Sequence, residues 1–185
     1  MQVTYELIHW GILRVIGVAA AFGLCGYLSA AYLLSEWPGR RSLMLPVPFA
    51  LLCALLFLHK AQVAVAAPLM VGVWLVANHV ATFVLFRTDV VSAACGAGLI
   101  GGLGLALCVS LCYRRVRTWR HLFVAALVGN LSSLPFVPWM NLYVSHYDPI
   151  GANPKAPPLA FAVWQATVGT YLYAACNGWN WWGER

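Results

Sequence analysis

The sequence predicts an all-α fold, a polytopic bundle of transmembrane helices in one domain that covers residues 1–185. Of these residues 62% are hydrophobic and only 9% are charged, whereas soluble proteins carry about 25% charged residues. The chain also contains six long stretches that lack Lys, Arg, Asp and Glu. A segment surrounded by lipid satisfies its backbone hydrogen bonds as a helix, so we expect six membrane-spanning helices.

The predicted spans are residues 15–35, 42–58, 61–86, 90–113, 121–144 and 158–176. The second is the shortest and carries Pro46 and Pro48 near its start. Because proline disrupts a helix interior, a broken or re-entrant segment is the alternative at this position, but we expect a full crossing.

Upstream of the first span, residues 6–13 are expected to form an interfacial turn of helix. Arg14 then lies at the membrane surface, where its long side chain reaches water. A removable signal peptide is the alternative for this segment, because Ser29 and Ala31 loosely resemble a cleavage site. We expect the segment to be retained as a span.

The basic residues predict that both termini lie in the cytoplasm. Six crossings bring the termini to one side, and Arg14, Lys60, Arg114, Arg115, Arg117 and Arg120 share that side, whereas Arg40, Arg41, Arg87 and Lys155 fall on the other. Basic residues are enriched in cytoplasmic loops. We expect the cluster Arg114, Arg115, Arg117 and Arg120 to contact lipid head groups. Nine arginines against two lysines, with abundant alanine and glycine, indicate a GC-rich bacterial genome and hence the bacterial inner membrane.

The fourth stretch carries a stripe of small residues at intervals of four, formed by Ala94, Gly98, Gly102 and Ala106. Such a stripe lets another helix approach closely, so it predicts a helix-packing interface. The partner is either another span of this chain or the same span of a second copy. The glycines do not form a phosphate-binding loop, because they lie inside an apolar run.

Prolines mark the third stretch at Pro68 and the fifth at Pro135 and Pro138. We expect a kink in the fifth, with Ser132 and Ser133 bonding the carbonyl groups that proline frees.

Polar side chains also lie within the apolar stretches, at Asn78, His79, Asn130 and Gln165. Polar groups in hydrocarbon usually face the bundle interior, so these four are predicted to converge on one cavity or pathway, with His79 foremost. The alternative is that each forms a separate hydrogen bond between helices.

The sequence favours a protein that is not an enzyme. Its five carboxylates, Glu6, Glu36, Asp89, Asp148 and Glu184, lie in predicted loops or near a terminus, so no paired-carboxylate site is expected inside the membrane. The six cysteines form no Cys-x-x-Cys pair and are expected to be core residues. Haem bound by two histidines is the alternative, but only His79 lies well inside a span. We expect no catalytic, metal-binding or cofactor-binding residues.

The expected function is a non-enzymatic transport, channel or membrane-sensing component that works as a homo-oligomer or as a subunit of a membrane complex. The alternatives are a membrane anchor or assembly subunit of a larger complex and, third, a haem-bearing membrane enzyme subunit. The net charge of +6 does not indicate a nucleic-acid partner, because the basic residues are spread over both predicted membrane faces.

Overall fold

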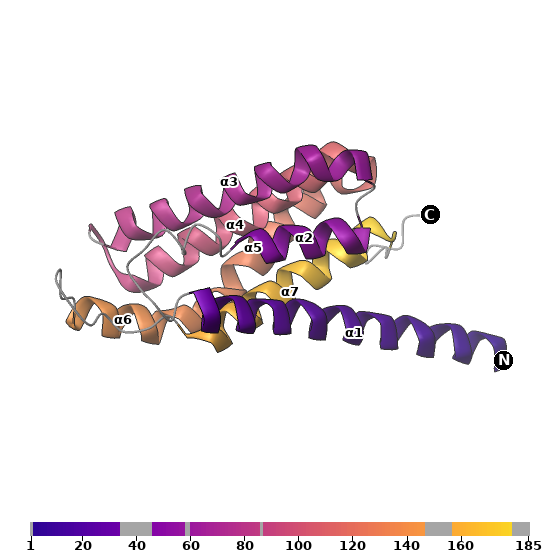
Figure 1. Cartoon of the computed structure of the whole chain (residues 1–185), viewed down its shortest axis with the longest axis horizontal. Coiled ribbons are helices and arrows are strands. Elements are labelled where there is room, and N and C mark those ends of the chain that lie inside the picture. Colours follow the sequence, from indigo (N-terminus) through magenta and orange to yellow (C-terminus); the bar gives the residue numbers. More distant parts are fainter. Residues whose placement is uncertain (1, 34–45, 58–59, 86, 147–156, 179–185) are drawn as a thin grey trace.

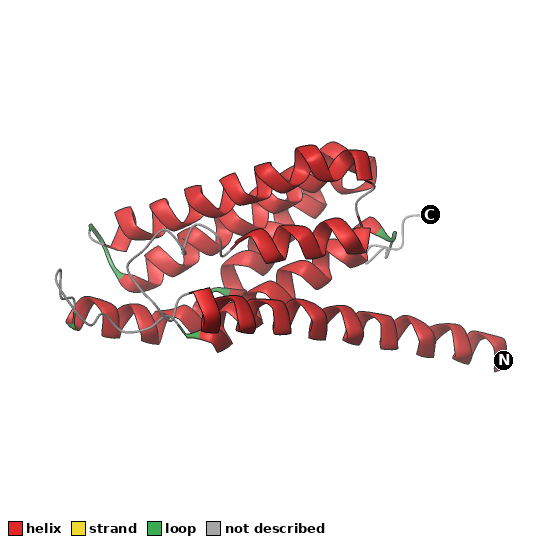
Figure 2. Cartoon of the chain, viewed as in Figure 1, coloured by secondary structure: helices red, strands yellow, loops and turns green. Residues whose placement is uncertain are grey.

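A computed structural model shows a bundle of α-helices and describes residues 2–33, 46–57, 60–85, 87–146 and 157–178 (Figures 1 and 2). The described segments contain no strand. The helices are α1 (Gln2–Leu33), α2 (Pro46–Phe57), α3 (Lys60–Leu85), α4 (Val90–Cys112), α5 (Trp119–Ser132), α6 (Val137–Ser145) and α7 (Pro158–Cys176), with 3-10 turns η2 (Arg114–Arg117) and η3 (Leu134–Phe136). The predicted all-α class is therefore confirmed.

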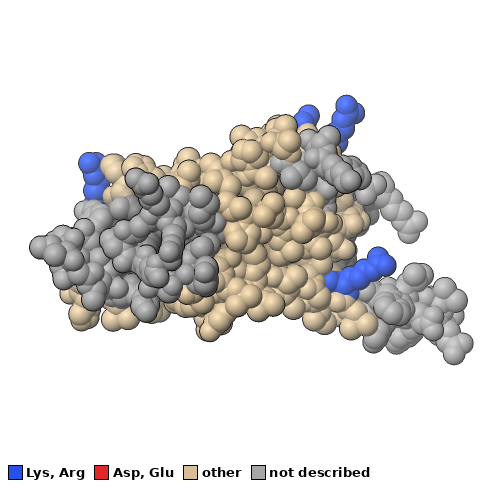
Figure 3. All heavy atoms as spheres, in the orientation of Figure 1, with Lys and Arg blue, Asp and Glu red and all other residues tan. Residues whose placement is uncertain are grey.

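Four segments are helical, long and apolar enough to cross a membrane: Gly11–Ala31, Ala64–Ala81, Val90–Cys112 and Trp119–Leu142. They lie in α1, in α3, in α4 and in the α5–η3–α6 segment. On the face shown in Figure 3, the described Lys and Arg side chains lie near the two ends of the bundle, and the flank between them shows no charged atoms. This distribution is the one expected of a membrane-embedded protein.

Helix α1 begins 13 residues earlier than the predicted first span, at Gln2 and not at residue 15. It runs unbroken for 32 residues from Gln2, so residues 6–13 belong to the same helix as the span. Arg14 lies within α1, and its side chain is exposed. At 1.5 Å per residue α1 is about 48 Å long, which exceeds the roughly 30 Å hydrocarbon core of a bilayer.

Helix α2 is much shorter than a membrane span. It has 12 residues, so it is about 18 Å long and does not cross a bilayer alone. Pro46 occupies its first position. Proline is favoured there because a backbone N–H group in the first turn has no acceptor within the helix, so nothing is lost when proline lacks it. Residues 34–45, which include the start of the predicted second span, lie outside the described residues. A full crossing at 42–58 is therefore not confirmed.

The fifth predicted span is interrupted, as its prolines predict. Helix α5 ends at Ser132, η3 contains Pro135, and α6 contains Pro138 in its first turn. The hydroxyl of Ser133 donates to the Asn130 carbonyl at 2.6 Å, and that of Ser132 donates to the Gly129 carbonyl at 3.2 Å. The two serines thus bond to the backbone just before the break. The carbonyls they bond, of Gly129 and Asn130, are not the ones that lie four residues before Pro135 and Pro138, so their predicted role is not confirmed.

The bundle is held together by three tightly packed helix pairs, α1–α7, α3–α4 and α4–α5. Helix α7 packs against α1, where the ring of Phe22 lies directly over Gly169, and α4 packs between α3 and α5. The main core includes Phe22, Val168 and Leu172, which are fully buried. Figure 1 shows the start of α1 and the end of α7 at the same end of the bundle.

Candidate functional site

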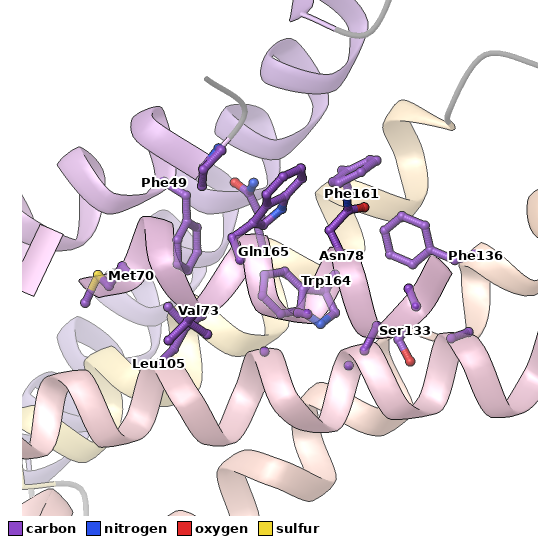
Figure 4. Close-up of a pocket in the computed structure, with 18 of the residues that line it drawn as sticks. Phe49, Met70, Val73, Asn78, Leu105, Ser133, Phe136, Phe161, Trp164 and Gln165 are labelled. Atoms are coloured by element: carbon purple, nitrogen blue, oxygen red, sulfur yellow. The ribbon is translucent and has the colours of Figure 1, made fainter. Parts of the chain in front are cut away.

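A cavity of about 140 Å³ lies inside the bundle among α2, α3, α4, η3, α6 and α7 (Figure 4). Its lining comes from the second half of α3, the first half of α4 and the first half of α7, together with the first turn of α2. These parts lie away from the start of α1 and the end of α7, so the cavity occupies the opposite half of the bundle.

Aromatic side chains form much of the cavity wall: Phe49, Trp74, Phe136, Trp139, Phe161 and Trp164. Phe49 and Trp164 pack with their ring centroids 6.1 Å apart, and Phe136 meets Phe161 edge to face at 4.8 Å. Figure 4 shows these as two groups on opposite sides of the lining. Contacts between rings in these geometries are favourable, so each pair stabilises its own part of the wall.

Gln165 brings an amide to this apolar lining. It lies on α7 one residue after Trp164, and its side chain is only 2% exposed. Its Oε1 atom has no hydrogen-bond partner. Among the described residues one other buried side-chain oxygen, Oγ1 of Thr170, shares this state, and Thr170 does not line the cavity. A buried amide oxygen without a partner costs about 1–3 kcal/mol, so the fold is less stable for having Gln165 here.

Asn78 is the second predicted residue that lines the cavity. It lies on α3 and, unlike Gln165, its side chain is exposed. A residue that is exposed and also lines a cavity marks the place where that cavity reaches the surface. Figure 4 shows Asn78 near Phe136 and Phe161, on the side away from Met70.

The other two polar residues predicted for the cluster lie elsewhere. Asn130 donates from Nδ2 to the Cys95 carbonyl at 3.2 Å, which ties α5 to α4, and it does not line the cavity. His79 is exposed and does not line it either. The structure thus brings Asn78 and Gln165 to one cavity and separates Asn130 and His79 from them.

The small-residue stripe of α4 packs against α5 of the same chain. A Cβ atom on Gly98 would overlap the Gly129 carbonyl, and one on Gly102 would overlap the Ala125 carbonyl. Ala94 and Ala106, the two ends of the stripe, are buried. The structure therefore fills this stripe within one chain, the first of the two partners considered from the sequence.

The basic cluster lies at the end of the bundle where α4 gives way to α5. Arg114, Arg117 and Arg120 have exposed side chains, and the guanidinium of Arg120 lies 5.9 Å from the ring of Trp119. The side chain of Arg115 is outside the described set. Exposed cations beside an exposed tryptophan are suited to the head-group region of a membrane.

The remaining histidines and cysteines form no metal-binding group in the part of the chain that the structure describes. No group of three or more His, Cys, Asp or Glu side chains is placed to hold a metal ion there. All six cysteines are free thiols. His121 is buried with its Nδ1 atom 3.1 Å from the hydroxyl of Tyr171, which itself donates to the His121 carbonyl at 2.9 Å.

Sequence reasoning missed the aromatic lining of the cavity. The side chains of Phe49, Phe136 and Trp164 are apolar residues in apolar stretches, and such residues serve a packed core equally well. No spacing signal distinguishes the two uses. Asn78 and Gln165 are the detectable signs, because an amide in an apolar run needs an explanation.

No protein-family model matches the chain, and neither does any curated protein or solved structure. The cavity and its two amide side chains are therefore the features from which a function is inferred.

Proposed function

We propose that this protein is a non-enzymatic membrane component, for transport or sensing, that takes a small and mainly apolar molecule into the cavity beside Gln165. The observation that carries the proposal is the cavity itself. Well-packed interiors leave few voids larger than a water molecule. Dry apolar cavities of about 150 Å³ are known to bind benzene, so a cavity of about 140 Å³ suits one small ring system.

The character of the lining favours a small molecule over an ion. Aromatic and aliphatic side chains dominate it, and the described residues contribute only three polar ones, Asn78, Ser133 and Gln165. Ion pathways are instead lined by rings of carbonyl groups or charged side chains. The exposed position of Asn78 gives the proposed ligand a way in from the lipid.

We place the protein in the membrane with six crossings and both termini in the cytoplasm. Helix α7 has 19 residues, about 28 Å, which is enough for a crossing. It is less hydrophobic on average than α4, but it is packed among other helices and needs less lipid-facing surface. The predicted span at 42–58, which contains α2, is the remaining crossing in this proposal. The exposed arginines at the terminal end would then face anionic head groups of a bacterial inner membrane.

The proposed protein works as a homo-oligomer or within a membrane complex. Because α5 covers Gly98 and Gly102, contacts between copies would have to use other faces of the bundle. A membrane anchor or assembly subunit is the second candidate, and the bond from Asn130 to Cys95 favours it, since that amide is paired within a closed contact between helices.

The proposal is tested by measuring the binding of indene, an apolar two-ring probe, to the protein in lipid nanodiscs by equilibrium dialysis. The wild type should bind indene saturably at one site per chain, above partition into the lipid. Ala77→Leu, which adds bulk to the cavity lining, should weaken that binding at least tenfold. Ala64→Leu makes the same change on the exposed part of α3 and should leave binding unchanged.

Equal, unsaturable uptake by all three proteins would overturn the binding proposal and favour the anchor. The visible spectrum of the same preparation tests the haem-bearing subunit, because bound haem gives a Soret band.

A further inference from the structure

We propose that the ligand of the cavity is a neutral aromatic molecule of one or two rings that carries an N–H or O–H group and donates it to Oε1 of Gln165. This inference rests on the proposed function, since it names the chemistry of the molecule that the cavity takes. Four features of the lining lead to it: its rings, its lack of charge, its size and its single unpaired acceptor.

The rings of the lining favour an aromatic occupant over an aliphatic one. Six of the lining side chains are aromatic, and Met70 and Met140 add two polarizable sulfur atoms. A flat ring inserted among them makes edge-to-face or offset contacts and sulfur–ring contacts, which a saturated chain does not make. The Phe136–Phe161 pair, which meets edge to face at 4.8 Å, shows that the lining already adopts this geometry.

The lining also indicates that the ligand is neutral. None of the described residues that form it is Lys, Arg, Asp, Glu or His. A charged ligand would therefore enter an apolar space without a counter-charge, which is strongly unfavourable. With a volume of about 140 Å³, the cavity suits a molecule of one or two fused rings.

The position of the polar group follows from which lining residues are already paired. Ser133 donates its hydroxyl to the Asn130 carbonyl at 2.6 Å, and Asn78 has an interaction of its own. The remaining polar residue, Gln165, has an Oε1 atom with no partner although the side chain is 98% buried, being 2% exposed. A donor that arrives with the ligand would satisfy this acceptor.

The amide of Gln165 can reach such a donor with little rearrangement. The last torsion of a glutamine side chain is broad and roughly two-fold, so the amide can turn to present its oxygen to the cavity. Figure 4 shows Gln165 at the edge of the lining, on the same part of the wall as Phe49 and Trp164. A ring that packs against these two aromatics would thus hold its N–H or O–H near the amide.

The experiment compares indole with indene, which has nearly the same shape but lacks the N–H group. Both are dialysed against the protein in nanodiscs, and binding is corrected for partition measured with Ala77→Leu. The wild type should bind indole about tenfold more tightly than indene, the ratio expected for one buried hydrogen bond. Gln165→Met, which keeps the length of the side chain and removes the acceptor, should bring the ratio close to one while indene still binds.

Gln62→Met is the matched control. Gln62 lies on α3 outside the cavity and donates from Nε2 to the Cys112 carbonyl at 3.5 Å, so this variant should keep the wild-type ratio. The wild-type ratio is informative even where a variant fails to fold, because it needs no substitution at Gln165.

The outcomes separate the two proposals. Saturable indene binding with no preference for indole in the wild type would overturn the inference about Gln165 and leave the proposed function standing. A preference for indole that Gln165→Met retains would also overturn the inference. Failure of both probes to bind above the Ala77→Leu level would overturn the proposed function.

Discussion

Helix α4 uses its two sides in opposite ways. On one side Gly98 and Gly102 press against α5, so closely that a single added carbon would overlap a carbonyl group of that helix. On the other side Ala97, Gly101 and Leu105 line the cavity, and the ring of Trp164 on α7 lies close against Gly101. Gly98 also borders the cavity, so the two sides meet along its edge. The same helix thus forms a closed contact with α5 on one side and part of the cavity wall on the other.

The polar groups follow the same division. On the closed side, the amide of Asn130 donates to the Cys95 carbonyl and is paired. On the open side, the amide oxygen of Gln165 has no partner. In a membrane, where helix association depends on packing and on hydrogen bonds between helices, the closed side holds the bundle together. The open side is where stability is sacrificed, which is typical of binding sites.

The largest loss of stability should come from disrupting the closed side, where α4 packs against α5. In Gly102→Ala the new Cβ would overlap the backbone carbonyl of Ala125, which moves only if the two helices separate. Overpacking of this kind costs about 1–3 kcal/mol, and we expect a clear fall in the midpoint of thermal unfolding in detergent. Gly96→Ala is the control on the same helix, because a Cβ there meets nothing within 4 Å. If both variants unfolded alike, the α4–α5 contact would not be the close one described.

A smaller change in the unfolding free energy is expected when the amides of Asn130 and Gln165 are replaced, and its sign should differ between the two sides of α4. Asn130→Leu removes the hydrogen bond to the Cys95 carbonyl and should lower the unfolding free energy by about 1 kcal/mol. Gln165→Met removes an unpaired buried oxygen and should raise it by about 1 kcal/mol in the ligand-free protein.

Thermal unfolding of the two amide variants, followed by circular dichroism, gives the comparison directly. A loss of stability in Gln165→Met would mean that the amide is paired in the protein and that the two sides of α4 do not differ in this respect.

The closed side could largely be predicted from the sequence, whereas the open side could not. Small residues every four positions on an apolar helix permit few uses other than close packing, so Gly98 and Gly102 are informative in themselves. The prolines likewise located the break between α5 and α6, because their effect on a helix is local.

The cavity depends on where helices end and how they tilt, which no local pattern records. Phe49 illustrates the difficulty, since its ring lies 5.3 Å from that of Phe22 in the core and also lines the cavity. Asn130 and Gln165 have the same amide group in similar apolar stretches, and only the structure shows that one is paired and the other is not. The length of α2 is a further example, because Pro46 permits a helix start without requiring one.

The smallest expected change in stability comes from the cap at the start of α4, outside the predicted span. It should affect the whole helix, and therefore both of its sides equally. Asp89 caps the helix, and its carboxylate accepts from the Ser92 amide at 2.8 Å and from the Ser92 hydroxyl at 2.6 Å. These bonds lower the pKa of Asp89 from its ordinary value of 3.8. A carboxylate whose pKa is lowered by folding stabilises the fold above its unfolded-state pKa, and that contribution is lost as the pH falls through the folded-state value.

The unfolding midpoint should therefore decrease as the pH is taken from above 3.8 to below it, and Asp89→Asn, which still caps a helix but does not titrate, should decrease less. Because the cap is exposed and remote from both sides of α4, Gly102→Ala and Gln165→Met should show the same pH dependence as the wild type. A pH dependence that changed in Gln165→Met but not in Gly102→Ala would mean that the open side responds to the start of the helix, and the two sides of α4 would then differ in coupling as well as in packing.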